Sequence, residues 1–398
     1  MTKLPLMLFG DELKKSLSYL PEFDDSIREK SQTDRLIALN ELYSLYFPSN
    51  QAAELYTKLY LSLRRAEQRM ESDDAAKQLY ENAKRIKNIT YLNKLESNSN
   101  SSFSLLGPSG CGKSTTLARI KYLLEDGNDK SHTFLIVEVP FDSSVKSMLL
   151  EILRQIDAKV GSRYYELACK SRMATVDILI GNTANCIINH KILGIAFDEC
   201  QNMMRSSSGL SLLNCITQIV NCSSCTIVFC GTPEVSEFFS KTFYMARRTT
   251  GITFSALEYK EFKDICNQLF EYQYCKHKVE INNVFIDWLW LHSQGNISVL
   301  ITLFHDAQEY AILDGSEVIS IESLNKAFRQ RLQHLNVFVQ QYVRKPLGAH
   351  QNSKGKHSVD CRHIGEGKEE IRDIVKSAKH NKLDVLRELS KIISVESV

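Results

Sequence analysis

The segment Gly107-Pro108-Ser109-Gly110-Cys111-Gly112-Lys113-Ser114 constrains the fold of this chain more than any other. It fits G-x-x-x-x-G-K-[ST], whose glycines let backbone N–H groups converge on a phosphate. The apolar run Ser102–Leu106 before it predicts a short buried strand, and the apolar spacing from Thr115 to Leu124 predicts a helix after it. The N-terminus of that helix would add positive potential to the loop. This context predicts a P-loop in an α/β sheet rather than a chance glycine-rich loop.

A second motif supplies two carboxylates. The apolar run Ile192–Phe197 predicts a buried strand, and Asp198 and Glu199 follow it directly. Such a strand can simply end in a carboxylate turn, but the P-loop upstream favours a nucleotide site. Asp198 would then hold Mg²⁺ through water, and Glu199 would polarise the attacking water. Lys113 would reach the β- and γ-phosphates. The residues expected to contact ATP or Mg²⁺ are Gly107, Pro108, Ser109, Gly110, Cys111, Gly112, Lys113, Ser114, Thr115 and Asp198, with Ser114 and Asp198 serving the metal.

A later strand and a basic pair complete the predicted catalytic set. The strand Thr226–Cys230 ends in Gly231-Thr232-Pro233-Glu234, a tip that lies beside the P-loop in a parallel sheet. We expect Thr232 to sense the γ-phosphate or orient water, a role compatible with capping a helix. Arg247 and Arg248 follow a predicted helix, and we expect at least one, Arg247 ahead of Arg248, to reach the γ-phosphate of a neighbouring subunit. The alternative is a solvated basic pair at a helix C-terminus.

Composition indicates an ordinary globular protein. Of the 398 residues, 43% are hydrophobic and 24% are charged, and the formal net charge is +2. Any nucleic-acid surface must therefore be a local patch. Since no stretch resembles a signal peptide or a membrane span, we expect a cytoplasmic protein whose 11 cysteines are mostly buried thiols. Cys222 and Cys225 have zinc-like spacing, but a second clean pair is missing, which argues against zinc.

Four regions follow from the patterning. Residues 1–95 predict a helical N-terminal extension, including helices over Thr33–Leu45 and Gln51–Met70. Residues 96–256 predict an α/β core, and residues 257–343 predict a small all-α lid. Residues 344–398 predict a flexible linker and an amphipathic tail helix, which either recruits a partner or docks on the protein. The expected core strands are Phe103–Leu106, Thr133–Val139, Ile192–Phe197, Thr226–Cys230 and Ile252–Phe254, and the expected lid helices are Phe262–Tyr272, Asn283–Ser293, Ile297–Leu313 and Ile321–Leu332.

These motifs together resemble the AAA+ ATPases, and in finer detail the TnsC/TniB regulators of DNA transposition. The finer resemblance rests on the Tyr-Phe-Pro-Ser turn at Tyr46–Ala52, the Asp-Glu-Cys-Gln-Asn-Met segment Asp198–Met203, the Gly-Thr-Pro-Glu tip Gly231–Glu234 and the lid segment Ser293–Ile297. It covers roughly residues 30 to 335. One departure is that Gly295–Val299 lacks the arginine that many AAA+ lids carry there, which implies slow or partner-controlled hydrolysis.

The resemblance implies a mechanism and partners. ATP would assemble subunits into a ring or filament on duplex DNA, linking a target-selection protein, including CRISPR effector complexes, to a transposase. Hydrolysis would end the assembly. Alternatives are a nucleotide-gated scaffold with negligible turnover and an initiator, loader or secretion-type AAA+ ATPase.

Four basic residues between the second strand and Asp198 are the predicted DNA contacts. Phosphate contacts need only mobile cations, so Lys146, Arg163, Lys170 and Arg172 would bind DNA without reading its sequence. For any one of them, a solvated helix face is the alternative.

Overall fold

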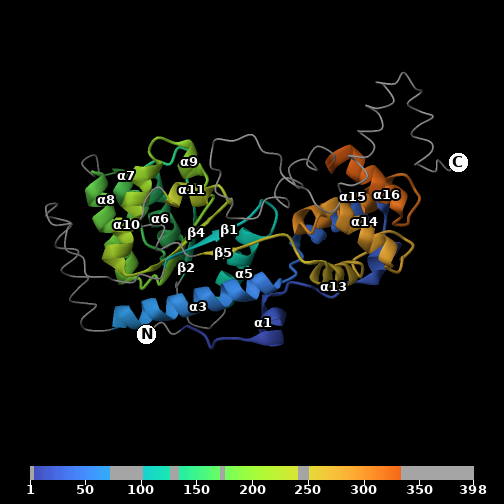
Figure 1. Cartoon of the computed structure of the whole chain (residues 1–398), viewed down its shortest axis with the longest axis horizontal. Coiled ribbons are helices and arrows are strands. Elements are labelled where there is room, and N and C mark those ends of the chain that lie inside the picture. The colour runs from blue at the N-terminus through green and yellow to red at the C-terminus, as the bar shows by residue number, and fades with distance from the viewer. Residues whose placement is uncertain (1–3, 72–101, 126–133, 171–174, 241–250, 333–398) are drawn as a thin grey trace, which may run out of the picture. The chain divides into compact units, whose positions relative to one another are not determined.

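Five parallel strands form one sheet at the centre of the core (Figure 1). The computed structural model describes residues 4–71, 102–125, 134–170, 175–240 and 251–332, all within one compact unit. The strand order is β2-β3-β4-β1-β5. The strands are β1 (Phe103–Leu106), β2 (Phe134–Glu138), β3 (Gly194–Asp198), β4 (Thr226–Gly231) and β5 (Ile252–Thr253). The predicted parallel α/β core is confirmed, with strand ends that differ by no more than two residues.

Alternating side chains give the sheet two buried faces. Leu135, Val137 and Phe197 pack with helices α6 (Val145–Val160), α8 (Val176–Asn189) and α10 (Gly209–Ser223). Phe134 and Ala196 on the opposite face pack with α3 (Asn50–Glu71) and α5 (Lys113–Glu125). Burial on both faces explains why the strands are almost wholly apolar rather than alternating with polar residues.

The remaining elements frame the sheet and form the lid. Outside the lid the structure has α1 (Gly10–Leu17), η1 (Asp25–Glu29), α2 (Gln32–Ala38), η2 (Leu39–Ser44), α7 (Tyr164–Lys170), α9 (Asn202–Arg205) and α11 (Val235–Ser240). The lid consists of α13 (Tyr259–Leu269), α14 (Asn283–Ser293), α15 (Ile297–Leu313) and α16 (Ile321–Ala327), continued by a π-helical turn, η3 (Phe328–Leu332). The predicted all-α lid is therefore present, although the helix expected over Ile321–Leu332 changes its hydrogen bonding at Phe328.

The prediction of one continuous helix over Thr33–Leu45 is wrong. The α-helix stops at Ala38, and a 3₁₀-helix, η2, replaces it. Leu39, Leu42 and Leu45 are buried at intervals of three residues, which matches the three residues per turn of a 3₁₀-helix. Because of this tighter winding, all three leucine side chains lie on one face of η2 and pack against the lid.

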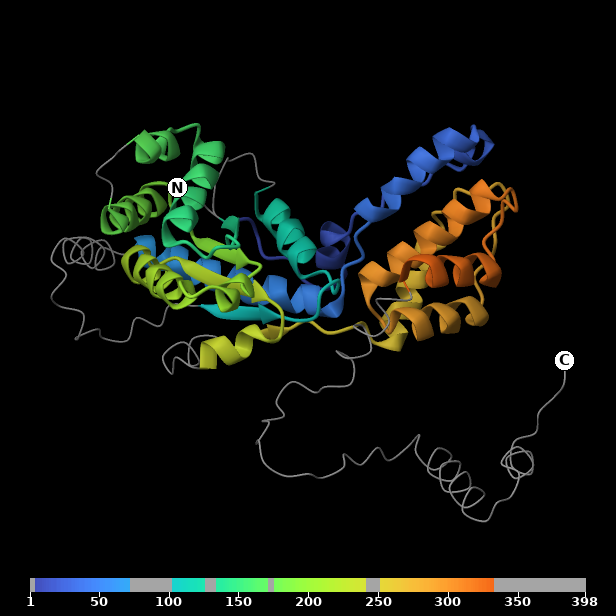
Figure 2. The same ribbon diagram turned by 90° about the horizontal axis from the view of Figure 1, so that it is seen from above.

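The N-terminal residues belong to two different cores. Leu39, Leu42, Leu45 and Phe47 pack into the lid cluster, whereas Tyr46 and the α3 residues Leu55 to Leu63 pack under the sheet. Figure 2 shows the corresponding blue segment beside the orange lid helices before it continues as α3. The backbone N–H of Ala52 donates to Ser49 Oγ (3.1 Å), which caps the start of α3. Residues 45–49 thus lead from the lid to the core.

Candidate functional site

The P-loop of the structure joins β1 to α5. Lys113 is the first residue of α5, and its Nζ donates to the carbonyl oxygens of Gly107 (2.7 Å) and Pro108 (2.8 Å). Gly110 has a φ of +81°, and a Cβ there would lie 2.7 Å from Asn296 Oδ1. Only glycine meets both the torsion and the close approach. The loop therefore presents its backbone N–H groups and the start of α5 to one pocket.

The carboxyl ends of three adjacent strands meet at that pocket. β4 lies between β1 and β3, so Thr232 after β4 separates the P-loop from Asp198 and Glu199 after β3. The pocket has a volume of about 310 Å³, in the range of small-molecule sites. Its lining includes Ser109, Gly110, Cys111, Gly112, Lys113, Ser114, Thr115, Asp198, Glu199 and Thr232. Gly107 and Pro108 do not line the pocket themselves, but their carbonyl oxygens accept hydrogen bonds from Lys113, which does.

The turn after β3 holds the two acids in a defined arrangement. Asp198 Oδ1 accepts the backbone N–H of Glu199 (2.9 Å). Glu199 has a φ of +57°, a left-handed conformation that a residue other than glycine rarely adopts. Gln201 Nε2 donates to Glu199 Oε2, and Gln201 Oε1 accepts the backbone N–H of Thr232 (3.3 Å). The acid and the β4 tip are thus connected through one amide.

The lid contributes polar contacts to the P-loop itself. Asn296 Nδ2 donates to the carbonyl of Ser109 (3.0 Å), while its Oδ1 caps α15 by accepting the N–H groups of Ser298 and Val299. The N–H of Ser298 donates to the carbonyl of Gly110 (3.2 Å). Many AAA+ lids carry an arginine in this segment. Here Asn296 and the start of α15 hydrogen-bond to the phosphate loop instead.

An apolar wall closes the other side of the pocket. It combines the N-terminal segment with the core-facing side of the lid and consists of Tyr43, Leu45, Tyr46, Phe47, Leu257, Ile265, Ile297 and Ile301. Tyr46 Oη lies 2.8 Å from Thr116 Oγ1, and its backbone pairs with Tyr19. Burial raises the pKa of Tyr46 to about 12, so this hydroxyl stays neutral. The wall suits a flat apolar group next to the phosphate loop.

Cys111 gives the P-loop a chemical probe. Burial raises the pKa of the Cys111 thiol to about 11, so little thiolate exists near neutral pH. At pH 8 we expect alkylation of Cys111 to be slower than that of exposed Cys169 on α7, to accelerate toward pH 10, and to be blocked by ATP. Peptide mapping by mass spectrometry after timed iodoacetamide treatment measures this. Equal rates at the two cysteines, or no protection by ATP, would contradict the described environment.

The remaining predicted site residues either are absent from the pocket lining or lie outside the described residues. Arg247, Arg248 and Arg172 lie outside the described residues. Lys146 is exposed in the first turn of α6, a helix of 16 residues and about 24 Å, and Arg163 follows its last turn. Lys170 is exposed and pairs with Glu166 on α7.

Three residues at the pocket had no role in the predictions from the sequence. Gln201, Asn296 and Tyr46 all contact or line the phosphate pocket, yet none had been given a role. The Asn-Ile-Ser sequence at Asn296 is a recognisable helix-capping pattern, which could have placed α15 but not its contact with Ser109. Nothing local signals the bond from Gln201 to the β4 tip.

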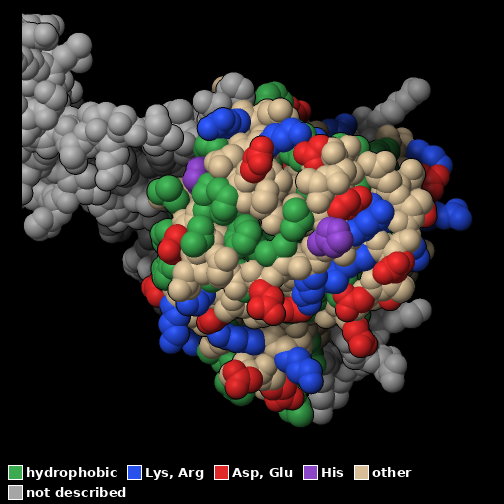
Figure 3. Space-filling model, turned by 90° about the vertical axis from the view of Figure 1, so that its right-hand side faces the viewer, with side chains coloured by type: hydrophobic (Ala, Val, Ile, Leu, Met, Phe, Trp, Pro, Cys, Tyr) green, Lys and Arg blue, Asp and Glu red, His purple; other side chains and the backbone are tan. Residues whose placement is uncertain are grey.

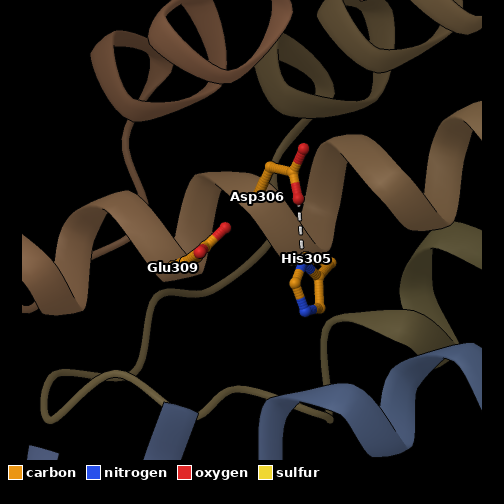
Figure 4. A group of neighbouring side chains, drawn as sticks. All are labelled: His305, Asp306 and Glu309. Carbon is orange, nitrogen blue, oxygen red and sulfur yellow. Dashed lines mark hydrogen bonds and ion pairs between the residues drawn. The ribbon is translucent and has the colours of Figure 1, made fainter. Parts of the chain in front are cut away.

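A cluster of side chains on α15 has residue types that could bind a metal ion, but these side chains form ion pairs with one another and with Arg331. His305, Asp306 and Glu309 bring ligand atoms within 4.8 Å of one another (Figure 4). His305 Nδ1 lies 2.8 Å from Asp306 Oδ1, and Arg331 pairs with Asp306 (3.4 Å) and Glu309 (2.8 Å). Arg331 already contributes one positive charge beside the two carboxylates that a cation would need. We assign the cluster to lid stability.

The Cys222 and Cys225 pair lies in the core. Both side chains are buried, and burial raises the pKa of Cys222 to about 12 and that of Cys225 to about 11. Ser223 Oγ donates to Cys225 Sγ (3.0 Å). The two cysteines pack in the core as small apolar side chains.

The lid end of the molecule carries mixed charge. Figure 3 shows Lys and Arg side chains interspersed with Asp and Glu around a group of hydrophobic side chains. The described part of this face therefore lacks the single-sign surface that a phosphate backbone favours. In the ranges that the structure covers, no helix has the length and hydropathy needed to cross a bilayer.

Comparison with known protein families supports the fold. Residues 97–239 match the AAA domain family, and no curated protein matches the sequence. Similar solved structures include the Aeropyrum pernix ORC2 protein in ADPNP–ADP complexes, at 16% identity and a TM-score of 0.43 over 62% of this chain and 66% of that one. Cdc6p from Pyrobaculum aerophilum shows 14% identity and a TM-score of 0.44 over 57% and 60%. The Aeropyrum pernix ORC1 protein in complex with DNA shows 16% and 0.46 over 80% and 81%.

This chain covers slightly less than two thirds of the ORC2 and Cdc6p chains. The AAA domain match, the β2-β3-β4-β1-β5 order and the helical lid confirm the predicted AAA+ P-loop fold. The match stops at the AAA domain and does not extend to the TnsC/TniB family.

Proposed function

We propose that this AAA+ protein binds and hydrolyses ATP with Mg²⁺ and that its nucleotide state controls its assembly on duplex DNA during DNA transposition. The observation that carries the enzymatic part is the convergence of Lys113, Asp198, Glu199 and Thr232 on one pocket. Asp198 and Glu199 come from the end of β3, Thr232 from the end of β4 and Lys113 from the start of α5. A phosphate loop, a water-activating carboxylate and a polar strand tip are what phosphoryl transfer requires.

The residues present divide the work of hydrolysis. Loop N–H groups and Lys113 would bind the phosphates, and Glu199 would accept the proton of the attacking water at its carboxylate. The Ser114 hydroxyl and the Asp198 carboxylate line the pocket and are hard oxygen donors, which suit Mg²⁺. When bound, the ion would neutralise phosphate charge. The apolar wall around Tyr46 supports a nucleotide over free phosphate, because it offers a surface for a base.

The DNA and transposition parts rest on the sequence resemblance. Three segments carry this resemblance, and each borders the pocket or leads away from it: the turn Tyr46–Ala52, the segment Asp198–Met203 and the tip Gly231–Glu234. If nucleotide controls the assembly, the segments that contact other subunits must be connected to the nucleotide pocket in this way. Arg247 or Arg248 would act across a subunit interface. Lys146, Arg163, Lys170 and Arg172 would contact DNA phosphates at separate points along the duplex. A transposase and a target-selection protein, including CRISPR effector complexes, are the proposed partners in the cytoplasm.

The proposed regions are an extension at 1–95, a core at 96–256, a lid at 257–343 and a tail at 344–398.

A second candidate is a DNA-bound scaffold whose nucleotide is hydrolysed negligibly. The lid favours it, because Asn296 and Ser298 hold the P-loop where an arginine would otherwise reach the γ-phosphate. A neutral amide stabilises developing phosphate charge less than a guanidinium does. Turnover separates the two candidates.

The test combines imaging with phosphate release. Full-length protein is mixed with duplex DNA and ATP, a non-hydrolysable analogue or no nucleotide, and examined by negative-stain microscopy. We expect nucleotide-dependent rings or filaments on DNA, and phosphate release that Lys113→Ala abolishes. Monomers under every condition would contradict the assembly, and equal phosphate release by Lys113→Ala would contradict the site. Assembly without turnover would select the scaffold.

A further inference from the structure

The four-residue turn Glu199–Asn202 is fastened to the strands on both sides of β3. The backbone N–H of Cys200 donates to the carbonyl of Cys230 on β4 (2.9 Å). Asn202 Nδ2 donates to the carbonyl of Val139 just after β2 (2.9 Å), and the Asn202 N–H closes the turn on Glu199 (2.9 Å). The backbone of the turn is thereby fixed relative to the sheet.

Within this fixed turn, the Gln201 side chain makes a two-sided contact. Its Nε2 donates to Glu199 Oε2, and its Oε1 accepts the N–H of Thr232. The partners define the orientation of the amide, because a carboxylate only accepts and a backbone N–H only donates. Gly231 makes room for this contact, since a Cβ there would approach Gln201 Oε1 to 3.1 Å.

The contact removes the remaining freedom of the Glu199 carboxylate. Its backbone is held by Asp198 and by the left-handed turn, so rotation of the exposed side chain is what would otherwise vary. Gln201 occupies one carboxylate oxygen, Oε2. Among the described residues no side chain or backbone group donates a hydrogen bond to Oε1, which leaves that oxygen to receive a proton from water.

We infer that Gln201 is a positioning residue for hydrolysis, which aims Glu199 Oε1 and ties its direction to the β4 tip at Thr232. This inference rests on the proposed ATPase function. The amide itself exchanges no proton. Its effect is geometric: a movement of the Thr232 tip, which lies in the phosphate pocket, is transmitted to the carboxylate through a single side chain.

Two substitutions separate the halves of the contact. Gln201→Ala removes both, and we expect kcat to fall about 10- to 100-fold, the cost of a base about 1 Å out of place, with KM unchanged. Gln201→Glu keeps an acceptor for the Thr232 N–H but cannot donate to Glu199 and repels it, so kcat should fall as far. The matched control is Gln155→Ala, because Gln155 makes a comparable bond to Glu151 (2.9 Å) on α6, outside the site.

A double-mutant cycle tests whether Gln201 acts through Glu199. Single-turnover ATP hydrolysis is measured for Gln201→Ala, Glu199→Gln and the double variant, with ATP affinity and the thermal midpoint recorded for each. We expect Gln201→Ala to cost nothing further once Glu199 is changed. Additive losses, weakened ATP binding or a kcat equal to that of Gln155→Ala would overturn the inference. A wild-type chain that binds ATP without turnover would refute the proposed function, and the role of Gln201 with it.

Discussion

Replacing Glu199 by glutamine is expected to lower ATP hydrolysis by about 10²- to 10⁴-fold, the usual contribution of a positioned general base. The amide keeps the size of the side chain but cannot take a proton from water. ATP affinity should remain close to wild type, because Lys113 and the loop N–H groups bind the phosphates without Glu199. Phosphate release at saturating ATP, paired with titration of a fluorescent ATP analogue, measures both quantities.

The control for this substitution is Glu237→Gln, which neutralises an exposed acid on α11 outside the pocket lining. Its turnover should equal that of wild type. If Glu199→Gln kept a rate within about threefold of wild type, which corresponds to less than about 1 kcal/mol in the barrier, the water would be activated by another group.

The same variant tests what hydrolysis does for the assembly. If hydrolysis ends the assembly, Glu199→Gln should stay on DNA much longer than wild type after excess ATP is diluted. If the protein is a scaffold with negligible turnover, the two lifetimes should agree. The readout is the decay of light scattering or of labelled protein on immobilised duplex.

Much of the fold was predictable because short, local sequence patterns determine its strands. Each core strand is an apolar run of a few residues, and the P-loop sits directly after one of them, so local pattern sufficed for β1, β3 and β4. The tip Gly231–Glu234 was placed beside the P-loop by a general property of parallel sheets, whose carboxyl ends share one edge.

The contacts that refine the site were not predictable in this way. Asn296 meets Ser109 across 187 residues of sequence, and Thr232 meets Gln201 across 31. Such bonds depend on how the lid and the strand tips approach in space, and nothing in the local sequence encodes that approach. The 3₁₀-helix η2 was missed for a related reason: leucines three apart fit an α-helix as well, and packing against the lid decides between the two.

Arg35 and Glu317 form the ion pair with the largest expected effect on stability. Arg35 on α2 is 1% exposed, and its two terminal nitrogens contact the Glu317 oxygens at 2.5 and 2.6 Å. Glu317 also accepts the N–H of Lys276 (3.3 Å). The pair joins the N-terminal segment to the lid, and that segment continues into the pocket wall at Tyr46.

Removing the carboxylate charge with Glu317→Gln is expected to destabilise the protein by about 3–5 kcal/mol, because it leaves a buried guanidinium without its counter-charge. The control Glu271→Gln, whose partner Lys278 is well exposed, should cost less than about 1 kcal/mol. Changing both partners, Arg35→Met with Glu317→Leu, should recover most of the loss, since no charge then remains buried. Thermal or denaturant unfolding of the wild type and the three variants decides this, and equal stability of Glu317→Gln and Glu271→Gln would contradict it.

The pH dependence of that loss follows from the sign of the pKa shift. The hydrogen bonds from the Arg35 guanidinium lower the pKa of Glu317 in the folded protein below its ordinary value. The stabilisation is therefore complete above the unfolded-state pKa, about 4.3, and is lost as the pH falls through the lower folded-state pKa. The stability gap between wild type and Glu317→Gln should be full at pH 7 and shrink below pH values of about 4. A gap that stayed constant down to acid unfolding would mean that shape, and not charge, holds the N-terminal segment on the lid.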